Sequence, residues 1–354
     1  MREILIDLES LKSNLKYIKS KANVPVLAVV KADAYGHGLI PCANAAVEAG
    51  ADWLGTALLE EAIALREAGI TAPTLAWLIT PGEDFKRAVI LGIDLGVSSL
   101  KTFDEINAIP GARIHLEVES GMGRGGFLTE WPELLNRDLS KVVGIFTHLA
   151  RADEPNEAQN TTQLNNFEKF VGDLQVKGVN PIRHFANTAA TLTSELARFD
   201  LVRIGIAMYG YSPLGNESSE SANLKPVMKV RAKLVLVKDM PAGHPIGYGA
   251  TEVTSQSTKI GIVGMGYADG IPRNAHGAGV TFEGKGVPII GRVSMDQFAV
   301  DLGPDSKAES GDWVTVIGEE FDCYKWAKAC QTITYEITTR IGPRITRRYI
   351  PSER

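Results

Sequence analysis

The sequence predicts an α/β protein of two domains, an amino-terminal (β/α)8 TIM barrel followed by a mainly-β domain. Short β-rich runs alternate with helical patterns up to about residue 210, and a β-rich texture with little helix begins near residue 225. A polar, turn-rich segment over 212–226 separates the two. For the first part, an open doubly wound sheet is the alternative, because alternation alone does not show that a sheet closes.

The predicted barrel strands are short apolar runs separated by helical sequence. In chain order they cover residues 24–30, 53–58, 74–79, 94–98, 112–119, 142–150, 182–188 and 201–210. A helix precedes the first strand, because leucine and isoleucine recur at helical spacing over 8–18. Another begins at Pro41 and ends at Gly50, the asymmetry typical of helix termini. Eight strands with helical crossovers in this length fit a parallel barrel.

We predict the barrel over residues 8–224 and the β domain over 225–354. Four β-rich segments, at 227–240, 257–266, 278–302 and 312–318, are joined by turns that contain glycine. Residues 1–7 also have the pattern of a strand, and we expect this strand to return to the second domain.

Composition indicates an enzyme-sized protein with neither a nucleic-acid nor a membrane partner. The 354 residues are 44% hydrophobic and carry a formal net charge of −5, whereas a broad nucleic-acid footprint needs a basic excess. No apolar stretch approaches the ~20 residues of a membrane span, and the amino terminus lacks the apolar core of a signal peptide. Cys42, Cys323 and Cys330 are widely spaced, so we expect a cytoplasmic protein without a metal site or disulfides.

The unusual residues fall where a barrel places its chemistry, at the carboxyl ends of its strands. Five predicted strands carry such groups. Lys31, Glu117, His148 and the "ANTAA" run at 186–190 lie late in a strand or at its exit, and the run at 202–210, which includes Arg203, contains the eighth strand and its exit. Thr188 offers a hydroxyl, and Gly205 allows close approach of an anion. A lysine beside a phosphate site suggests pyridoxal 5′-phosphate held through the lysine amine.

Nine segments in a fixed order resemble the alanine racemase family. They are "VVKADAYGHG", "GMGR", "GIFTHLARADE", "ANTAA", "RIGIAMYG", "GYGATE", "GYADGIPR", "GRVSMDQ" and "TITYE". The resemblance spans nearly the whole chain. It implies a barrel with a β domain, pyridoxal 5′-phosphate as cofactor, and a homodimer with shared active sites. It also implies the interconversion of L- and D-alanine, which supplies D-alanine for the cell wall.

The resemblance assigns roles to the matching residues. Lys31 would carry the cofactor and act as one acid/base, and Tyr248 from the partner subunit would be the second base. The residues implied to bind the cofactor are Lys31, Tyr35, His148, Asn187, Thr188, Arg203, Gly205, Ile206 and Tyr335. Those implied for the substrate are Arg124, Tyr267 and Met295, with Glu117 and Asp296 in support.

Arg203 matches the arginine that faces the cofactor's pyridine nitrogen. Because a guanidinium has a pKa above about 12, it does not pass its proton to pyridine. The ring nitrogen would then stay neutral, which weakens the electron sink and suits a racemase better than a transaminase. A free tyrosine has a pKa of about 10, so Tyr248 needs help from a network such as His148 and Arg203.

The chain departs from the family pattern at Glu117. Many members have a carbamylated lysine at this place, seven residues before the motif arginine, which here is Arg124. We hypothesise that the Glu117 carboxylate replaces the carbamate and holds Arg124. Ser120 and Ile204 also replace common residues of the pattern, but neither change removes a required functional group.

Other functions stay open at this point. Racemisation of serine, lysine or another amino acid is one alternative, because entrance loops set side-chain selectivity. A protein that binds pyridoxal phosphate without turnover is another, although such proteins resemble the barrel alone. A barrel-type decarboxylase is a third, but its cysteine motif is not evident in the second domain.

Overall fold

The computed structural model describes residues 1–215, 218 and 221–350, which form two compact units. The barrel unit comprises Glu9–Ala34 and Leu39–Lys225. The β unit comprises Met1–Leu8, Tyr35–Gly38 and the chain from Pro226 onward. Within the predicted segments 212–226 and 225–354, residues 216–217, 219–220 and 351–354 lie outside the described part of the chain.

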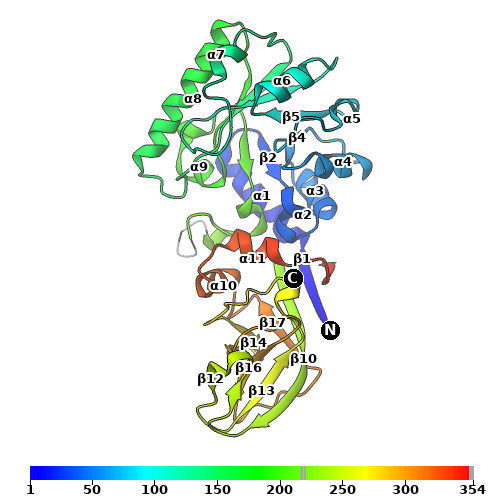
Figure 1. Ribbon diagram of the computed structural model, residues 1–354, viewed down its shortest axis with the longest axis vertical. Coiled ribbons are helices and arrows are strands. Elements are labelled where there is room, and N and C mark those ends of the chain that lie inside the picture. The colour runs from blue at the N-terminus through cyan, green and yellow to red at the C-terminus, as the bar shows by residue number, and fades with distance from the viewer. Residues whose placement is uncertain (216–217, 219–220, 351–354) are drawn as a thin grey trace. The chain divides into compact units, whose positions relative to one another are not determined.

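The barrel unit is built on a parallel sheet (Figure 1). Its strands are β2 (Val26–Val29), β3 (Trp53–Thr56), β4 (Thr74–Ala76), β5 (Ile93–Val97), β6 (Ile114–Glu117), β7 (Val142–Phe146), β8 (Ile182–His184) and β9 (Val202–Ile204). The order β8-β7-β6-β5-β4-β3-β2-β9 follows the chain, except that the last strand pairs with the first. The Arg203 N–H donates to the Ala186 carbonyl at 3.0 Å and joins the two ends of the sheet. The barrel prediction is confirmed, because a doubly wound sheet would reverse its strand order.

Every crossover between these strands contains a helix, and the helices lie outside the strands in Figure 1. The helices are α1 (Leu8–Ala22), α2 (Lys31–Gly36), α3 (Leu39–Glu48), α4 (Leu59–Glu67), α5 (Phe85–Ile90), α6 (Leu100–Asn107), α7 (Trp131–Leu134), α8 (Ala158–Val176) and α9 (Thr188–Thr193). Short 3₁₀ turns follow as η1 (Glu195–Ala197), η2 (Ile206–Tyr209) and η3 (Ser221–Asn223). Strands β2, β4 and β5 are buried along their whole length, as expected for a parallel sheet covered on both faces.

The β unit is a mainly antiparallel sheet that closes on itself. Its strands are β1 (Arg2–Asp7), β10 (Met228–Met240), β11 (Pro245–Ile246), β12 (Glu252–Val253), β13 (Thr258–Val263), β14 (Gly279–Phe282), β15 (Lys285–Ile290), β16 (Phe298–Gly303), β17 (Trp313–Ile317) and β18 (Thr346–Ile350). Pairing between β10 and β13 closes a ring with β16, β15, β14 and β17. Strand β10 has 13 residues, so its first half pairs with β1 and β17 and its second half with β13.

The amino-terminal strand β1 pairs antiparallel with β10 and parallel with β18, so it belongs to the sheet of the β unit. Two helices, α10 (Cys323–Ala329) and α11 (Thr334–Arg340), and two 3₁₀ turns, η4 (Tyr248–Ala250) and η5 (Tyr267–Asp269), complete this unit. Ile246, Ile260 and Ile290 form an apolar cluster within it.

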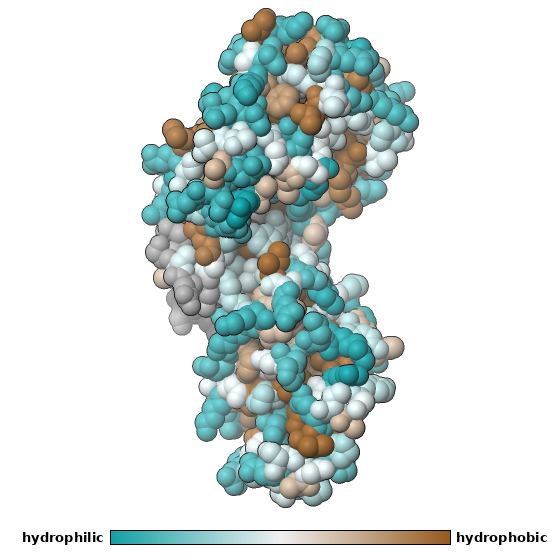
Figure 2. All heavy atoms as spheres, turned by 60° about the vertical axis from the view of Figure 1, so that its left-hand side comes forward, coloured by the Kyte–Doolittle hydropathy of each residue, from teal (hydrophilic) through white to brown (hydrophobic). Residues whose placement is uncertain are grey.

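The face drawn in Figure 2 is mostly hydrophilic, with hydrophobic residues in small scattered groups. Within the described residues, the structure holds no helix with the length and apolar character needed to cross a membrane. Cys42, Cys323 and Cys330 are buried and form no disulfide within the described residues.

We predict that Gly144→Ala destabilises the barrel unit. A Cβ atom at Gly144, on β7, would lie 2.0 Å from Nδ1 of the buried His115 ring. The strand or the ring must therefore move, and we expect a loss of about 1–3 kcal/mol in the free energy of unfolding. Urea denaturation measures this loss.

The matched control is Gly172→Ala on α8, where nothing lies within 4 Å of the added Cβ. Alanine favours the helix there, so this variant should be unchanged or more stable by roughly 0.5–1 kcal/mol. Equal stability of the two variants would contradict the packing of Gly144 against His115.

Candidate active site

Cationic side chains gather at the carboxyl ends of the barrel strands. Lys31 comes directly after Val30 at the end of β2, Arg203 lies on the neighbouring strand β9, and Arg124 lies in the loop after β6. Burial lowers the pKa of the Lys31 amine, and the charges of Arg124 and Arg203 act in the same direction. A lowered pKa makes the neutral amine, which is the form that attacks a carbonyl group, easier to reach.

The chain leaves Lys31 through a left-handed turn. Residues 32–35 all have φ between 53° and 54°, although none of them is glycine. Left-handed backbone costs roughly 1–2 kcal/mol per residue for L-amino acids, and it persists only where the surroundings impose it. One such restraint is the Glu61 carboxylate, which accepts the Ala32 N–H at 2.6 Å. The local residue types do not predict this turn.

Arg203 is only 6% exposed, and backbone carbonyls of two neighbouring strand ends hold its guanidinium. Nη1 donates to the His184 carbonyl, and Nη2 donates to the Thr147 carbonyl at 2.6 Å. Burial lowers the pKa of Arg203 to about 10, so the group keeps its charge at neutral pH.

His148 accepts at Nδ1 from Arg203 Nη2, at 3.4 Å. Burial lowers the pKa of His148 to about 3, helped by the charges of Arg203, Arg124 and Lys31. The ring is therefore neutral at neutral pH. Because its Nδ1 accepts, its single proton lies on Nε2.

Two glutamates next to Arg124 have opposite environments. Burial raises the pKa of Glu117, although Arg124 and Arg203 act to lower it. Within the described chain the Glu117 carboxylate makes no direct ion pair with Arg124, so its effect there is through space. Burial also acts to raise the pKa of Glu119, but four backbone N–H bonds lower it overall. The donors and their distances are Gly121 at 2.5 Å, Met122 at 2.5 Å, Gly123 at 2.9 Å and Arg124 at 3.2 Å.

Glu119 therefore shapes the loop that carries Arg124, a role that we did not predict from the sequence. Gln163, fully buried on α8, connects the same loop to the end of β7. Its side-chain amide donates to Ser120 Oγ at 3.0 Å and to the His148 carbonyl at 2.9 Å. No motif in the sequence singles out this glutamine.

The predicted phosphate-binding residues form a corner between β8 and β9. The Gly205 N–H donates to Thr188 Oγ1 at 2.9 Å. The Asn187 side chain caps α9 by accepting the Ala190 N–H at 3.1 Å, so it fixes the helix that begins at Thr188. The turn η2 starts at Ile206, and its first N–H groups have no partner within the turn. These donors suit an anion.

A row of buried polar groups runs beneath Arg203. His115 contacts His184 Nε2 through Nδ1 at 2.9 Å and Asp94 Oδ2 through Nε2 at 3.1 Å. The His184 ring also stacks on Phe146, with ring centroids 5.0 Å apart. The backbone carbonyl of His184 accepts from Arg203, so these side chains pack at the strand end that holds the guanidinium. We did not identify these histidines from the sequence.

The β unit holds the remaining predicted residues. The Tyr35 and Tyr335 rings lie 6.1 Å apart, and burial raises the pKa of Tyr35, which keeps its hydroxyl protonated. The side chains of Tyr248, Tyr267 and Met295 are 67%, 39% and 54% exposed.

Two loops of the β unit are joined through their backbones. The Tyr267 N–H donates to the Ser294 carbonyl at 3.0 Å, and the Ala268 N–H donates to the Met295 carbonyl at 2.9 Å. This pairing holds the loops of Tyr267 and Met295 together. Asp296, in the second loop, accepts from Arg344 Nη2 at 2.8 Å.

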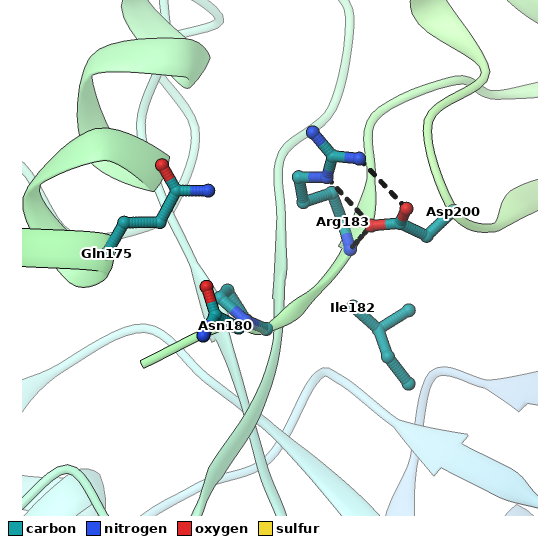
Figure 3. A pocket seen from close by; sticks show the side chains of 6 residues that line it. Gln175, Asn180, Ile182, Arg183 and Asp200 are labelled. Atoms are coloured by element: carbon teal, nitrogen blue, oxygen red, sulfur yellow. Dashed lines mark hydrogen bonds and ion pairs between the residues drawn. The ribbon is translucent and has the colours of Figure 1, made fainter. Parts of the chain in front are cut away.

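A separate pocket of about 410 Å³ lies near the amino end of β8 (Figure 3). Arg183, which lines it, donates from Nε and Nη2 to the Asp200 carboxylate at 2.8 and 2.9 Å. The Arg183 charge is thus already paired, and none of the predicted site residues lines this pocket.

The groups at the carboxyl ends of the barrel strands fit pyridoxal 5′-phosphate. Its aldehyde needs an amine of lowered pKa, its ring nitrogen needs a buried partner, and its phosphate needs N–H and hydroxyl donors. Lys31, Arg203 and the corner of Thr188, Gly205 and Ile206 have the chemistry that these three requirements call for. Fold and site together define a barrel-type enzyme that depends on pyridoxal phosphate.

Comparison with known proteins gives the family. Residues 6–213 match the alanine racemase N-terminal domain, and residues 227–349 match the alanine racemase C-terminal domain. The chain belongs to the alanine racemase family.

Named relatives and solved structures similar to this chain agree with this family. The chain is 42% identical to an alanine racemase of Salinispora tropica, over 96% of this chain and 95% of that protein. The crystal structure of alanine racemase from D-cycloserine-producing Streptomyces lavendulae has a TM-score of 0.95 and 43% identity, over 99% of this chain and 97% of that chain. A Bartonella henselae alanine racemase with covalently bound pyridoxal phosphate has a TM-score of 0.88 and 29% identity, over 99% of both chains.

We predict that Glu119→Gln destabilises the protein in a pH-dependent way. The glutamine amide nitrogen cannot accept N–H bonds, so part of the Arg124 loop loses its partner. Because the pKa of Glu119 is lower in the folded state, its contribution is complete above the unfolded pKa of about 4.3 and is lost in acid. The stability difference from wild type should therefore be widest near neutrality and shrink as the pH falls.

Chemical denaturation over a pH series measures this difference. Glu168→Gln is the control, because Glu168 is exposed on α8. A stability difference for Glu119→Gln that stays constant with pH would contradict the role given to the Glu119 carboxylate.

Proposed function

We propose that this protein interconverts L-alanine and D-alanine by a two-base mechanism. Family membership supports the substrate. The observation that carries the chemistry is the Lys31 amine at the end of β2, the strand that pairs with β9, which carries Arg203. Pyridoxal 5′-phosphate, when bound, supplies the electron sink that makes the α proton of an amino acid removable.

Lys31 is proposed as the acid/base on one face of the substrate. Its Nζ lies 5.9 Å from the centre of the Trp77 ring, among residues that follow other strands of the barrel. Burial lowers the pKa of this amine, so its neutral form, which can accept a proton, is easier to reach. Lys31 cannot reach the opposite face, and racemisation therefore needs a second group.

We propose the partner subunit's Tyr248 as that second group, in a homodimer with shared active sites. Tyr248 and Met295 are large side chains that this chain leaves mostly exposed, as expected where another protein surface covers them. His148 and Arg203 would support the ionisation of the tyrosine from the barrel side.

Arg203 and Arg124 have different proposed tasks. Arg203 would hold the ring nitrogen of the cofactor without giving up its proton, since its pKa of about 10 keeps the guanidinium charged. Arg124, at the end of the loop folded by Glu119, would bind the substrate carboxylate, with Glu117 as a nearby acidic group. Tyr267 and Met295 would line the entrance, and Asp296 would hold their loop through Arg344.

We further propose that the protein works in the cytoplasm and supplies D-alanine for the cell wall. Racemisation of serine or lysine is the second candidate, because the entrance loops that set selectivity are exposed in this chain.

The function is tested by incubating the purified holoenzyme with L-alanine, L-serine and L-lysine separately. We expect D-alanine to form fastest, as measured by chiral chromatography. Faster formation of D-serine or D-lysine would assign another substrate, and the absence of every D-isomer would reject racemisation.

We predict that Tyr248→Phe lowers kcat by about 10²–10⁴-fold, the usual contribution of a general acid/base. The absorbance of the Lys31-bound cofactor should not change, because the phenol does not hold it. In heavy water the variant should still exchange the α proton of one alanine enantiomer, because Lys31 remains on its face.

Tyr17→Phe on α1 controls for the loss of a tyrosine hydroxyl elsewhere. A Tyr248→Phe variant that racemises alanine at the wild-type rate would remove Tyr248 from the mechanism.

A further inference from the structure

We propose that Glu61 is a positioning residue for Lys31. Its carboxylate holds the left-handed turn that follows the lysine, and so fixes the direction in which the amine leaves β2. This inference rests on the proposed function only in taking Lys31 as the lysine that carries the cofactor.

Glu61 lies in the first turn of α4 and joins two loops. Its Oε1 accepts the Ala32 N–H at 2.6 Å, immediately after Lys31. Its Oε2 accepts the N–H groups of Ala57 and Leu58, each at 3.1 Å, in the loop after β3. Because β2 and β3 are adjacent parallel strands, one carboxylate ties their carboxyl ends together.

Lys31 is fixed from both sides along the chain. On its amino side, the Val30 N–H donates to the Gly55 carbonyl at 2.8 Å and continues the pairing with β3. On its carboxyl side, the bond from Ala32 to Glu61 follows at once. These hydrogen bonds on Val30 and Ala32 restrain the backbone on both sides of the lysine.

The turn needs such a restraint, because L-residues avoid the left-handed backbone that residues 32–35 adopt. Its far end is closed separately, where Asp33 Oδ1 accepts the Leu39 N–H at 2.8 Å. Glu61 also caps α4 through the Leu58 N–H. The cap of α4 uses only Oε2 of Glu61. The hydrogen bond that Oε1 accepts from the Ala32 N–H is not part of this cap.

The test uses Glu61→Gln, whose amide keeps the size of the side chain but has one acceptor oxygen in place of two. The apo protein is titrated with pyridoxal 5′-phosphate, and borohydride reduction followed by peptide mass analysis gives the fraction of Lys31 that is modified. We expect cofactor binding to weaken about tenfold, the effect of losing one charge-assisted hydrogen bond. Glu67→Gln, the same change at the exposed far end of α4, should match wild type.

A second substitution separates positioning from helix capping. Ala32 is exposed, so Ala32→Gly removes no packing, and glycine adopts the left-handed backbone without strain. In the Glu61→Gln background it should recover most of the lost cofactor affinity. A variant weakened only through the cap of α4 would gain nothing from this glycine.

Two results would overturn the proposal: wild-type labelling of Lys31 in Glu61→Gln, or no recovery with Ala32→Gly. If Glu61→Gln does not fold, Glu61→Asp replaces it with the same expected outcomes, because the shorter carboxylate cannot span both loops. Wild-type protein that labels at Lys31 but racemises no amino acid would reject the proposed function and leave the role of Glu61 standing.

Discussion

The buried guanidinium of Arg203 is the constraint on which the barrel site depends. A charge out of water is tolerated only when its hydrogen bonds are met, and here the acceptors are backbone carbonyls that follow β7 and end β8. The backbone N–H of the same residue closes the sheet against Ala186. Satisfying this one side chain therefore requires the carboxyl ends of β7, β8 and β9 to converge, next to the strand that presents Lys31.

The electrostatics of the site follow from that burial. Burial and the fixed cation of Arg203 lower the pKa of His148, which leaves the imidazole neutral. Burial is also the main cause of the lowered pKa of Lys31, to which the Arg203 charge contributes. The hydrogen bonds of His115 and His184 are consistent with neutral imidazoles at this site. Asp94 accepts from His115 Nε2, so the other ring nitrogen of His115, Nδ1, accepts from His184 Nε2. Because the proton of His184 is on Nε2, its Nδ1 carries none and is an acceptor. That nitrogen has no partner in the described structure, which agrees with burial holding the pKa of His184 well below its usual value.

The sequence predicts the barrel well because its signals are local: apolar runs, helical spacing and strand-end residues, which the barrel rule converts into positions in space. It does not predict contacts that depend on long-range approach. Residues 32–35 contain no glycine, so nothing local marks a left-handed turn. In the sequence, Glu61 and Glu119 cannot be distinguished from ordinary surface glutamates. Only the folded structure shows that their carboxylates accept backbone N–H groups. Our hypothesis from the family pattern is that the Glu117 carboxylate holds Arg124. The structure shows an electrostatic interaction between the two groups through space and no direct ion pair within the described chain.

The strained turn stands where the chain passes from one packing unit to the other. Lys31 belongs to the barrel unit, while Tyr35–Gly38 packs with the β unit. Within that unit the Gly36 carbonyl accepts from Arg347 Nε at 2.9 Å, and a Cβ at Gly36 would lie 2.3 Å from the Thr338 carbonyl oxygen. The chain must therefore pass from the lysine to a tightly packed glycine within five residues. The left-handed backbone before this glycine is strained, and this strain is the reason that a restraint as direct as the Glu61 carboxylate is needed next to Lys31.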